Sequence, residues 1–160
     1  MLYWLLVTLS ILTTLPIVVV CVEVGAALAT RRRRFDDSAA RPRVDVLIPA
    51  HDEASGIAAT LASIRAQLRP GDRVGVVADN CTDDTAAIAR AAGAIVWERR
   101  DDVRRGKGFA LEFGRERLSP ECGDVAVIVD ADCRLEPGTL DALACEAATT
   151  GRPVQADYIM

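Results

Sequence analysis

The fold is decided by residues 125–132, Val-Ala-Val-Ile-Val-Asp-Ala-Asp, in which five apolar residues run directly into two aspartates. An apolar run without polar alternation is typical of a strand covered on both faces, as in parallel sheets packed between helices. Ligands of open α/β sheets bind at the carboxyl ends of the strands. The stretch therefore predicts a buried strand that carries Asp130 and Asp132 to a binding edge.

These two aspartates are one residue apart and can offer hard oxygen ligands to the same divalent cation. Mg²⁺ in proteins is typically held by one or two carboxylates together with substrate phosphates. The alternative is an ordinary turn, because turns favour Asp for its local hydrogen bonds. The other motifs of the chain have to decide between a metal-diphosphate site and such a turn.

Composition limits the classes of function. The chain has 160 residues, 51% of them hydrophobic, which suits one domain plus a membrane segment. Residues 44–160 carry 13 basic and 20 acidic side chains. This acidic balance argues against a nucleic-acid partner, which would require a basic face. Five cysteines without a C-x-x-C pair indicate neither a zinc knuckle nor a disulfide framework, and they suit a reducing compartment.

Residues 1–30 predict a transmembrane anchor, and residues 31–43 a basic linker. The apolar run exceeds the roughly 20 residues that cross a bilayer, and Arg31–Arg34 follow it at once. A cleavable signal peptide carries its positive charge before the apolar core, whereas these arginines come after it and would resist translocation. We therefore expect a single-pass protein of the cell membrane with its domain on the cytoplasmic side.

Residues 44–160 alternate strand-like runs with helical patterns and predict one α/β domain with a mostly parallel sheet. A helix capped by Ser55 is expected to bury Ile57, Leu61, Ile64 and Leu68. A helix that begins at Pro137 is expected after the aspartates. The expected strands are Val44–Ile48, Val74–Ala78, Ala94–Trp97, the stretch Val125–Asp132, and a further strand from Pro153.

In this arrangement Glu53, Asp79 and Asp130 share one edge of the sheet, because each follows an apolar strand. The loop from Glu98 to Gly108 holds five basic residues. Either it is a solvated loop, or Lys107 and one arginine meet an anionic group. The segment lacks the glycines and the Ser or Thr of a P-loop, and no G-x-G-x-x-G follows the first strand, so NTPase and dinucleotide folds are disfavoured.

Four motifs in this order resemble the N-terminal half of family 2 glycosyltransferases. They are Leu-Ile-Pro-Ala-His-Asp-Glu at 47–53, Ala-Asp-Asn-Cys-Thr-Asp-Asp-Thr at 78–85, Arg-Gly-Lys-Gly at 105–108 and Val-Asp-Ala-Asp at 129–132. The resemblance covers about residues 44–160. It implies a GT-A fold, an α/β sandwich that binds nucleotide sugars, incomplete at its C-terminus. Asp52, where relatives often have Asn, is a mild departure.

The resemblance also implies the roles of individual residues. Asp130 and Asp132 would hold Mg²⁺ or Mn²⁺. The residues implied to bind the nucleotide-sugar substrate are Pro49, His51, Glu53, Asp79, Lys107 and Asp130. The catalytic base of the family is expected beyond Met160.

The implied function is transfer of a sugar, with inversion, from a nucleotide sugar to a lipid-linked or polysaccharide acceptor at the membrane. Uridine diphosphate is the commonest carrier in the family. The alternative is a truncated, non-catalytic remnant that at most binds nucleotide diphosphate.

Overall fold

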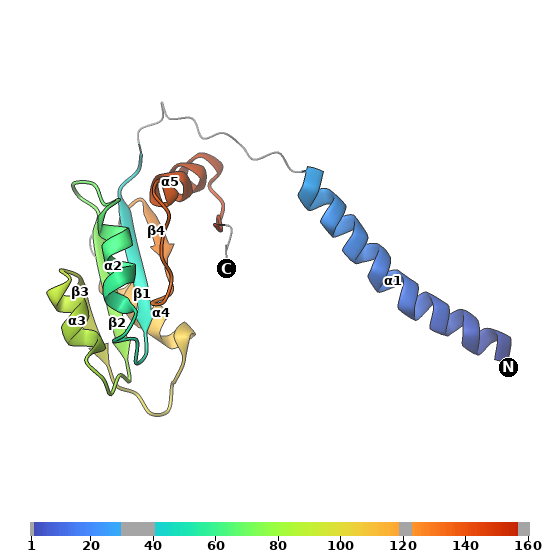
Figure 1. Ribbon diagram of the computed structural model, residues 1–160, viewed down its shortest axis with the longest axis horizontal. Helices are drawn as coiled ribbons and strands as arrows, with labels where there is room; N and C mark the ends of the chain where they lie inside the picture. Colours follow the sequence, from blue (N-terminus) through green and yellow to red (C-terminus); the bar gives the residue numbers. More distant parts are fainter. Residues whose placement is uncertain (1, 30–40, 119–122, 157–160) are drawn as a thin grey trace. The chain divides into compact units, whose positions relative to one another are not determined.

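The computed structural model describes residues 2–29, 41–118 and 123–156. The chain divides into two compact units, Met1–Arg34 and Phe35–Met160 (Figure 1). The first unit contains the helix α1, Leu2–Ala29. Its segment Tyr3–Ala26 has a mean hydropathy of 2.6 and is long and apolar enough to cross a membrane. The helix predicted for residues 1–30 is therefore confirmed as a helix.

The second unit is built on a four-stranded sheet. Its strands are β1 (Val44–Ala50), β2 (Arg73–Asp79), β3 (Ile95–Arg99) and β4 (Val125–Ile128). The order across the sheet is β3-β2-β1-β4, and each neighbouring pair is parallel. The sequence-based prediction of a parallel α/β sheet is confirmed, and the carboxyl ends of all four strands point to the same edge.

Helices cover both faces of this sheet (Figure 1). The helices α2 (Ile57–Arg65), α3 (Thr85–Ala91) and α5 (Thr139–Thr150) pack on one face, where even-numbered residues of β1 such as Val46 and Ile48 are buried. The helix α4 (Lys107–Leu118) packs on the other face, against Leu47 and Val77. This alternation follows from the two-residue period of a strand.

Close packing of α4 depends on a glycine. Ala110, Gly114 and Leu118 form its buried stripe at a spacing of four residues. A Cβ atom added at Gly114 would lie 2.6 Å from Leu47 Cδ1 and 2.8 Å from Val77 Cγ2. The helix therefore approaches the sheet more closely than a larger residue would allow without a shift of Leu47 and Val77.

The strand at the centre of the sequence argument differs from its prediction. β4 is covered on one face only, since Val127 is buried whereas Ile128 is 55% exposed. The physical reason is its edge position: α4 lies over β1 and β2 and leaves the same face of β4 uncovered. Burial on both faces holds for the central strands β1 and β2, but it was wrong for β4.

Several predicted boundaries also move. β1 continues through Pro49 to Ala50. The carbonyl of Leu47 accepts from the Val129 N–H, so odd-numbered residues of β1 direct their backbone groups toward β4. Pro49 lies beyond the paired part of β4, where its missing N–H interrupts no ladder bond.

Helix starts and the last strand need correction as well. α2 begins after Gly56 without a side-chain cap, so the Ser55 cap was wrong. α5 begins at Thr139 after Gly138, whose φ of 85° requires a residue such as glycine, rather than at Pro137. Residues 153–156 form no strand, and the rest of the strand expected there lies outside the described residues.

Candidate functional site

A pocket of about 390 Å³ opens at the carboxyl edge of the sheet. It lies between the loops that follow β1 and β2 and the start of α4. The residues that line it are Pro49, Ala50, His51, Glu53, Asp79, Asn80, Arg105, Gly106, Lys107 and Ala110. Five of the six residues predicted to bind substrate are among them, and the sixth, Asp130, contacts Lys107. Residues from four separate motifs thus meet at one place.

The loops after β1 and β2 are joined by side-chain hydrogen bonds. His51 Nδ1 donates to the carbonyl of Asp79 at 2.7 Å. The carboxylate of Asp52 accepts from the Thr82 N–H at 2.6 Å, and this bond holds the pKa of Asp52 below its usual value. Glu53 N–H donates to Thr85 Oγ1 at 2.8 Å. These bonds hold the loop after β1, which carries His51 and Glu53, against the loop after β2.

Asp79 ends β2 inside the pocket wall and pairs with an arginine that the sequence did not single out. Arg99 Nη1 lies 2.6 Å from Asp79 Oδ1, and both side chains are buried. Arg99 Nη2 also donates to Asp101 Oδ2 and to the Arg104 carbonyl. In the sequence, Arg99 is one of five basic residues in the Glu98–Gly108 segment, and nothing distinguishes it from the other four. Its pairing with Asp79 follows from the register of β2 and β3, which the sequence does not reveal.

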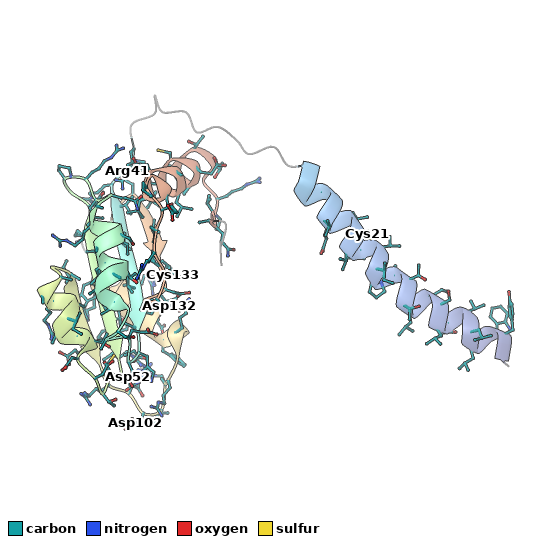
Figure 2. The ribbon with its side chains drawn as sticks, viewed as in Figure 1. Cys21, Arg41, Asp52, Asp102, Asp132 and Cys133 are labelled. Carbon is teal, nitrogen blue, oxygen red and sulfur yellow. The ribbon has the colours of Figure 1, made fainter. Side chains whose placement is uncertain are left out.

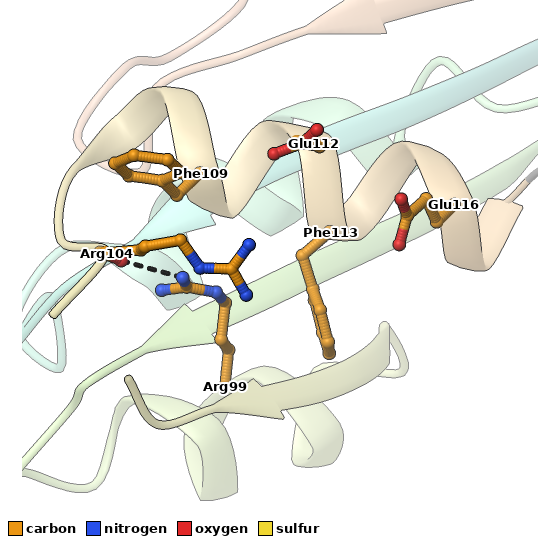
Figure 3. Close-up of a pocket in the computed structure, with 6 residues that line it drawn as sticks. All are labelled: Arg99, Arg104, Phe109, Glu112, Phe113 and Glu116. Carbon is orange, nitrogen blue, oxygen red and sulfur yellow. Dashed lines mark hydrogen bonds between the residues drawn. The ribbon is translucent and has the colours of Figure 1, made fainter. Parts of the chain in front are cut away.

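Arg99 also lines a second, smaller pocket of about 110 Å³, shown in Figure 3. It is lined by Arg99, Arg104, Phe109, Glu112, Phe113 and Glu116. The Arg99 guanidinium carbon is 5.9 Å from the centre of the Phe109 ring, within the range of a cation–π contact. Arg99 therefore links Asp79 to α4 and to the loop that precedes it.

That loop delivers Lys107 to the main pocket. Gly106, with φ of 111°, makes the turn that starts α4, and its carbonyl accepts from the Phe109 and Ala110 N–H groups. Lys107 is the first residue of α4. Its ammonium group and the positive end of the helix dipole both favour an anion at this end of the helix. The ammonium forms an ion pair with the carboxylate of Asp130.

The turn with the two aspartates is held from α2. The hydroxyl of the buried Thr60 donates to the carbonyl of Ala131 at 2.7 Å, between the two aspartates, and the Cys133 N–H donates to the carbonyl of Asp130. Asp132, labelled in Figure 2, is exposed. The structure therefore brings Asp130 to Lys107 at the pocket, with Asp132 one residue beyond Ala131 on the same turn.

The donor set of this turn fits a hard divalent cation. Both groups are carboxylates, both are reachable from solvent, and Mg²⁺ and Mn²⁺ prefer oxygen ligands of this kind. Asp52, Cys81 and Asp83 form another group, whose ligand atoms lie within 4.8 Å of one another and which sequence analysis missed. Its carboxylates already accept hydrogen bonds from the N–H groups of Thr82, Thr85 and Ala54. These bonds hold the loops after β1 and β2 in place.

Comparison with known proteins gives the family. Residues 45–154 match the profile of Glycosyl transferase family 2. The low-salt glycan biosynthesis hexosyltransferase Agl6 of Haloferax volcanii is 37% identical over 99 residues, which are 61% of this chain and 22% of that protein. An uncharacterized glycosyltransferase of Mycobacterium tuberculosis is 34% identical over 103 residues, 64% of this chain and 43% of that protein. The chain thus spans less than half the length of these relatives.

Solved structures agree. A mannosyltransferase from Pyrobaculum calidifontis, in complex with GDP-Man and Mn²⁺, has a TM-score of 0.60 at 29% identity, over 73% of this chain and 36% of that one. Glucosyl-3-phosphoglycerate synthase from Mycobacterium tuberculosis, in complex with Mn²⁺, UDP-Glc and phosphoglyceric acid, has a TM-score of 0.56 at 32% identity, over 69% and 40%. The matched profile and these neighbours show that the chain belongs to glycosyl transferase family 2 and has its GT-A fold.

Proposed function

We propose that this chain is the donor-binding part of a membrane-anchored glycosyltransferase. It would transfer a sugar, with inversion, from a nucleotide sugar, UDP-linked by preference, to a lipid-linked or polysaccharide acceptor. The observation that carries the proposal is the main pocket, which gathers Pro49, His51, Glu53, Asp79 and Lys107 beside Asp130. Its volume of about 390 Å³ lies within the range of small-molecule sites.

The pocket offers complementary groups for the two parts of a nucleotide diphosphate. Asp79 and Glu53 present carboxylates that accept hydrogen bonds from a base or a ribose. Lys107, Arg105 and the amino end of α4 present positive charge for phosphate groups. The acidic and basic sides of one pocket thus suit a ligand with a donor-rich nucleoside and an anionic tail.

A divalent cation would be held by Asp130 and Asp132. Bound there, it supplies Lewis-acid neutralisation of the negative charge that develops on a leaving diphosphate. The neighbouring structures with Mn²⁺ support a divalent metal in the family. The acceptor hydroxyl must also lose a proton to a base. Among residues 2–29, 41–118 and 123–156 we assign that role to no side chain.

The anchor belongs to the same proposal. The apolar α1 supports a membrane span, and the four arginines after it support a cytoplasmic domain by the positive-inside rule. A cytoplasmic site would have direct access to nucleotide sugars. A second candidate is a non-catalytic domain that binds nucleotide diphosphate. It is supported by the same pocket, whose basic side with Arg105 and Lys107 suits a diphosphate.

The test is a calorimetric titration of the full chain, purified in detergent, with UDP and with GDP. Each titration is done with Mn²⁺ and with EDTA. We expect one of the two nucleotides to bind with Mn²⁺ and to lose most of its affinity in EDTA. A folded chain that binds neither nucleotide in Mn²⁺ would overturn both candidates. Turnover of the matching nucleotide sugar with membrane extracts as the acceptor source then separates the enzyme from the binding domain.

A further inference from the structure

The ion pair between Lys107 and Asp130 joins two motifs that lie 23 residues apart in the chain. Lys107 is the first residue of α4, and Asp130 follows β4 by two residues. Within the described part of the chain, the Asp130 carboxylate pairs with Lys107 alone. One of the two carboxylates suited to a cation is thus already neutralised by a side chain of the protein.

The ion pair between Lys107 and Asp130 can open at low cost in free energy. The two side chains are 55% and 41% exposed, and ion pairs between solvent-exposed side chains are weak. The lysine ammonium is a compact charge on a flexible stem, so it can leave one oxygen for another nearby without movement of the backbone. By contrast, the buried pair of Arg99 and Asp79 leaves no comparable freedom to its partners.

A divalent cation and the ammonium compete for the same carboxylate. If both stayed beside Asp130, they would repel each other, and the repulsion is strong at the few ångströms that such ligands allow. Among the described residues that line the pocket, the carboxylates are Glu53 and Asp79, and Asp79 is paired with Arg99. A diphosphate brings a further partner for Lys107 that carries more negative charge than a single carboxylate.

We propose that Lys107 is an exchangeable counterion that makes the divalent cation and the nucleotide diphosphate bind cooperatively. In the empty pocket it holds Asp130 and weakens metal binding. When a diphosphate enters, Lys107 moves to a phosphate oxygen and Asp130 becomes available to the metal. This coupling rests on the proposed function of the site. Because coupling between two ligands is reciprocal, the metal must raise nucleotide affinity by the same factor.

The test measures Mn²⁺ binding in the absence of nucleotide, by the electron paramagnetic resonance signal of free Mn²⁺, on the full chain in detergent. Three variants are compared with the wild type: Lys107→Met, Lys107→Arg and Arg105→Met. Lys107→Met should bind Mn²⁺ at least about fivefold more tightly, at the lower end of usual coupling factors. Lys107→Arg keeps the charge and should stay close to the wild type. Arg105→Met removes an equal charge from the same pocket wall and should change Mn²⁺ affinity less than Lys107→Met does.

The second measurement is the factor by which saturating Mn²⁺ raises the affinity for UDP or GDP. This factor should be smaller in Lys107→Met than in the wild type. If Lys107→Met binds Mn²⁺ no more tightly than the wild type, or keeps the whole factor, the counterion proposal is wrong while the proposed function stands. If the wild type binds neither nucleotide with Mn²⁺, the proposed function fails and this coupling fails with it.

Discussion

Arg99 and Asp79 stand directly opposite each other on β3 and β2, and their side chains form an ion pair of 2.6 Å at the carboxyl end of the sheet. They are only 7% and 8% exposed. Arg99 reaches further, to Asp101 and to the Arg104 carbonyl. One buried guanidinium therefore ties the acidic wall of the pocket to the basic loop that ends in Lys107.

Replacement of this arginine should destabilise the domain strongly. In Arg99→Met the carboxylate of Asp79 stays buried without its cation, and the removal of one partner of a buried pair costs about 3–5 kcal/mol. Urea unfolding followed by circular dichroism measures this change. Arg100→Met, at the exposed neighbouring position, is the control and should lie within about 0.5 kcal/mol of the wild type. Equal stability of the two variants would contradict the role given to Arg99.

Gly114 offers a test of how α4 meets the sheet. Gly114→Ala should destabilise the domain, because the new methyl group collides with Leu47 and Val77 and overpacking costs about 1–3 kcal/mol. With contacts under 3.0 Å to both side chains, we expect a cost in the upper part of this range, which exceeds the gain of about 1 kcal/mol from better helix propensity. The matched control is Gly108→Ala in the same helix, where an added Cβ meets nothing within 4 Å. A higher melting temperature for Gly114→Ala than for the wild type would refute the close packing.

Much of this architecture could be predicted from the apolar runs. Runs such as Val44–Ile48 and Val74–Ala78 predict buried parallel strands. Parallel strands place the residues that follow them at one edge of the sheet, so Glu53, Asp79 and Asp130 are expected at the same edge. The structure confirms the common edge. Whether each of these residues binds substrate or metal stays a prediction, since geometry alone does not assign a role.

Other features depend on tertiary neighbours that composition does not reveal. The run in β4 reads like that of a central strand, yet Ile128 is exposed because no helix covers that side of the sheet edge. Asp141 belongs to none of the four motifs, and the sequence shows no partner for it. It lies 2.5 Å from nitrogens of both Arg41 and Arg69, so its removal would disturb the start of the domain. Glu116, which is exposed near the C-terminal end of α4, is therefore a better control position for the metal site than Asp141.

Asp72 should make stability fall in acid. Burial would raise the pKa of this carboxyl, but N–H donors from Arg69 and Val44 and the Arg41 guanidinium lower it below its ordinary value of 3.8. A lowered pKa stabilises the fold above about pH 4, and this stabilisation is lost as the pH falls through the folded-state value. Asp72→Asn should therefore melt lower at pH 7 and lose less between pH 5 and pH 3, measured by thermal denaturation. Parallel curves for the two proteins would contradict this account.

The topology of the anchor is tested with reporters fused after Met160. Because four arginines follow the apolar span, a fluorescent reporter that folds only in the cytoplasm should be bright, and alkaline phosphatase at the same point should be inactive. Replacement of Arg31–Arg34 by serine should reduce this bias. The protein should also stay with the membrane after carbonate extraction. Active phosphatase in the unaltered chain would overturn the cytoplasmic placement.

Asp132 is the sharpest test of the metal site. A diphosphate beside two carboxylates is repelled, and two unit charges about 4 Å apart repel by roughly 4 kcal/mol at an effective dielectric of about 20. A cation between the diphosphate and the carboxylates turns this repulsion into a net attraction. Asp132→Asn keeps the shape and removes the charge, so Mn²⁺-dependent nucleotide affinity should fall at least about tenfold, or about 1.4 kcal/mol.

Calorimetry of UDP and GDP binding, with Mn²⁺ and with EDTA, measures this loss. Glu116→Gln removes the same charge nine residues into α4 from Lys107, or about 14 Å along the helix axis, and should leave both affinities unchanged. The residual affinity in EDTA should be the same or slightly higher in Asp132→Asn, because one repelling carboxylate is gone. If the wild type binds and Asp132→Asn keeps the full Mn²⁺-dependent affinity, the cation is held elsewhere and Asp132 has no part in it.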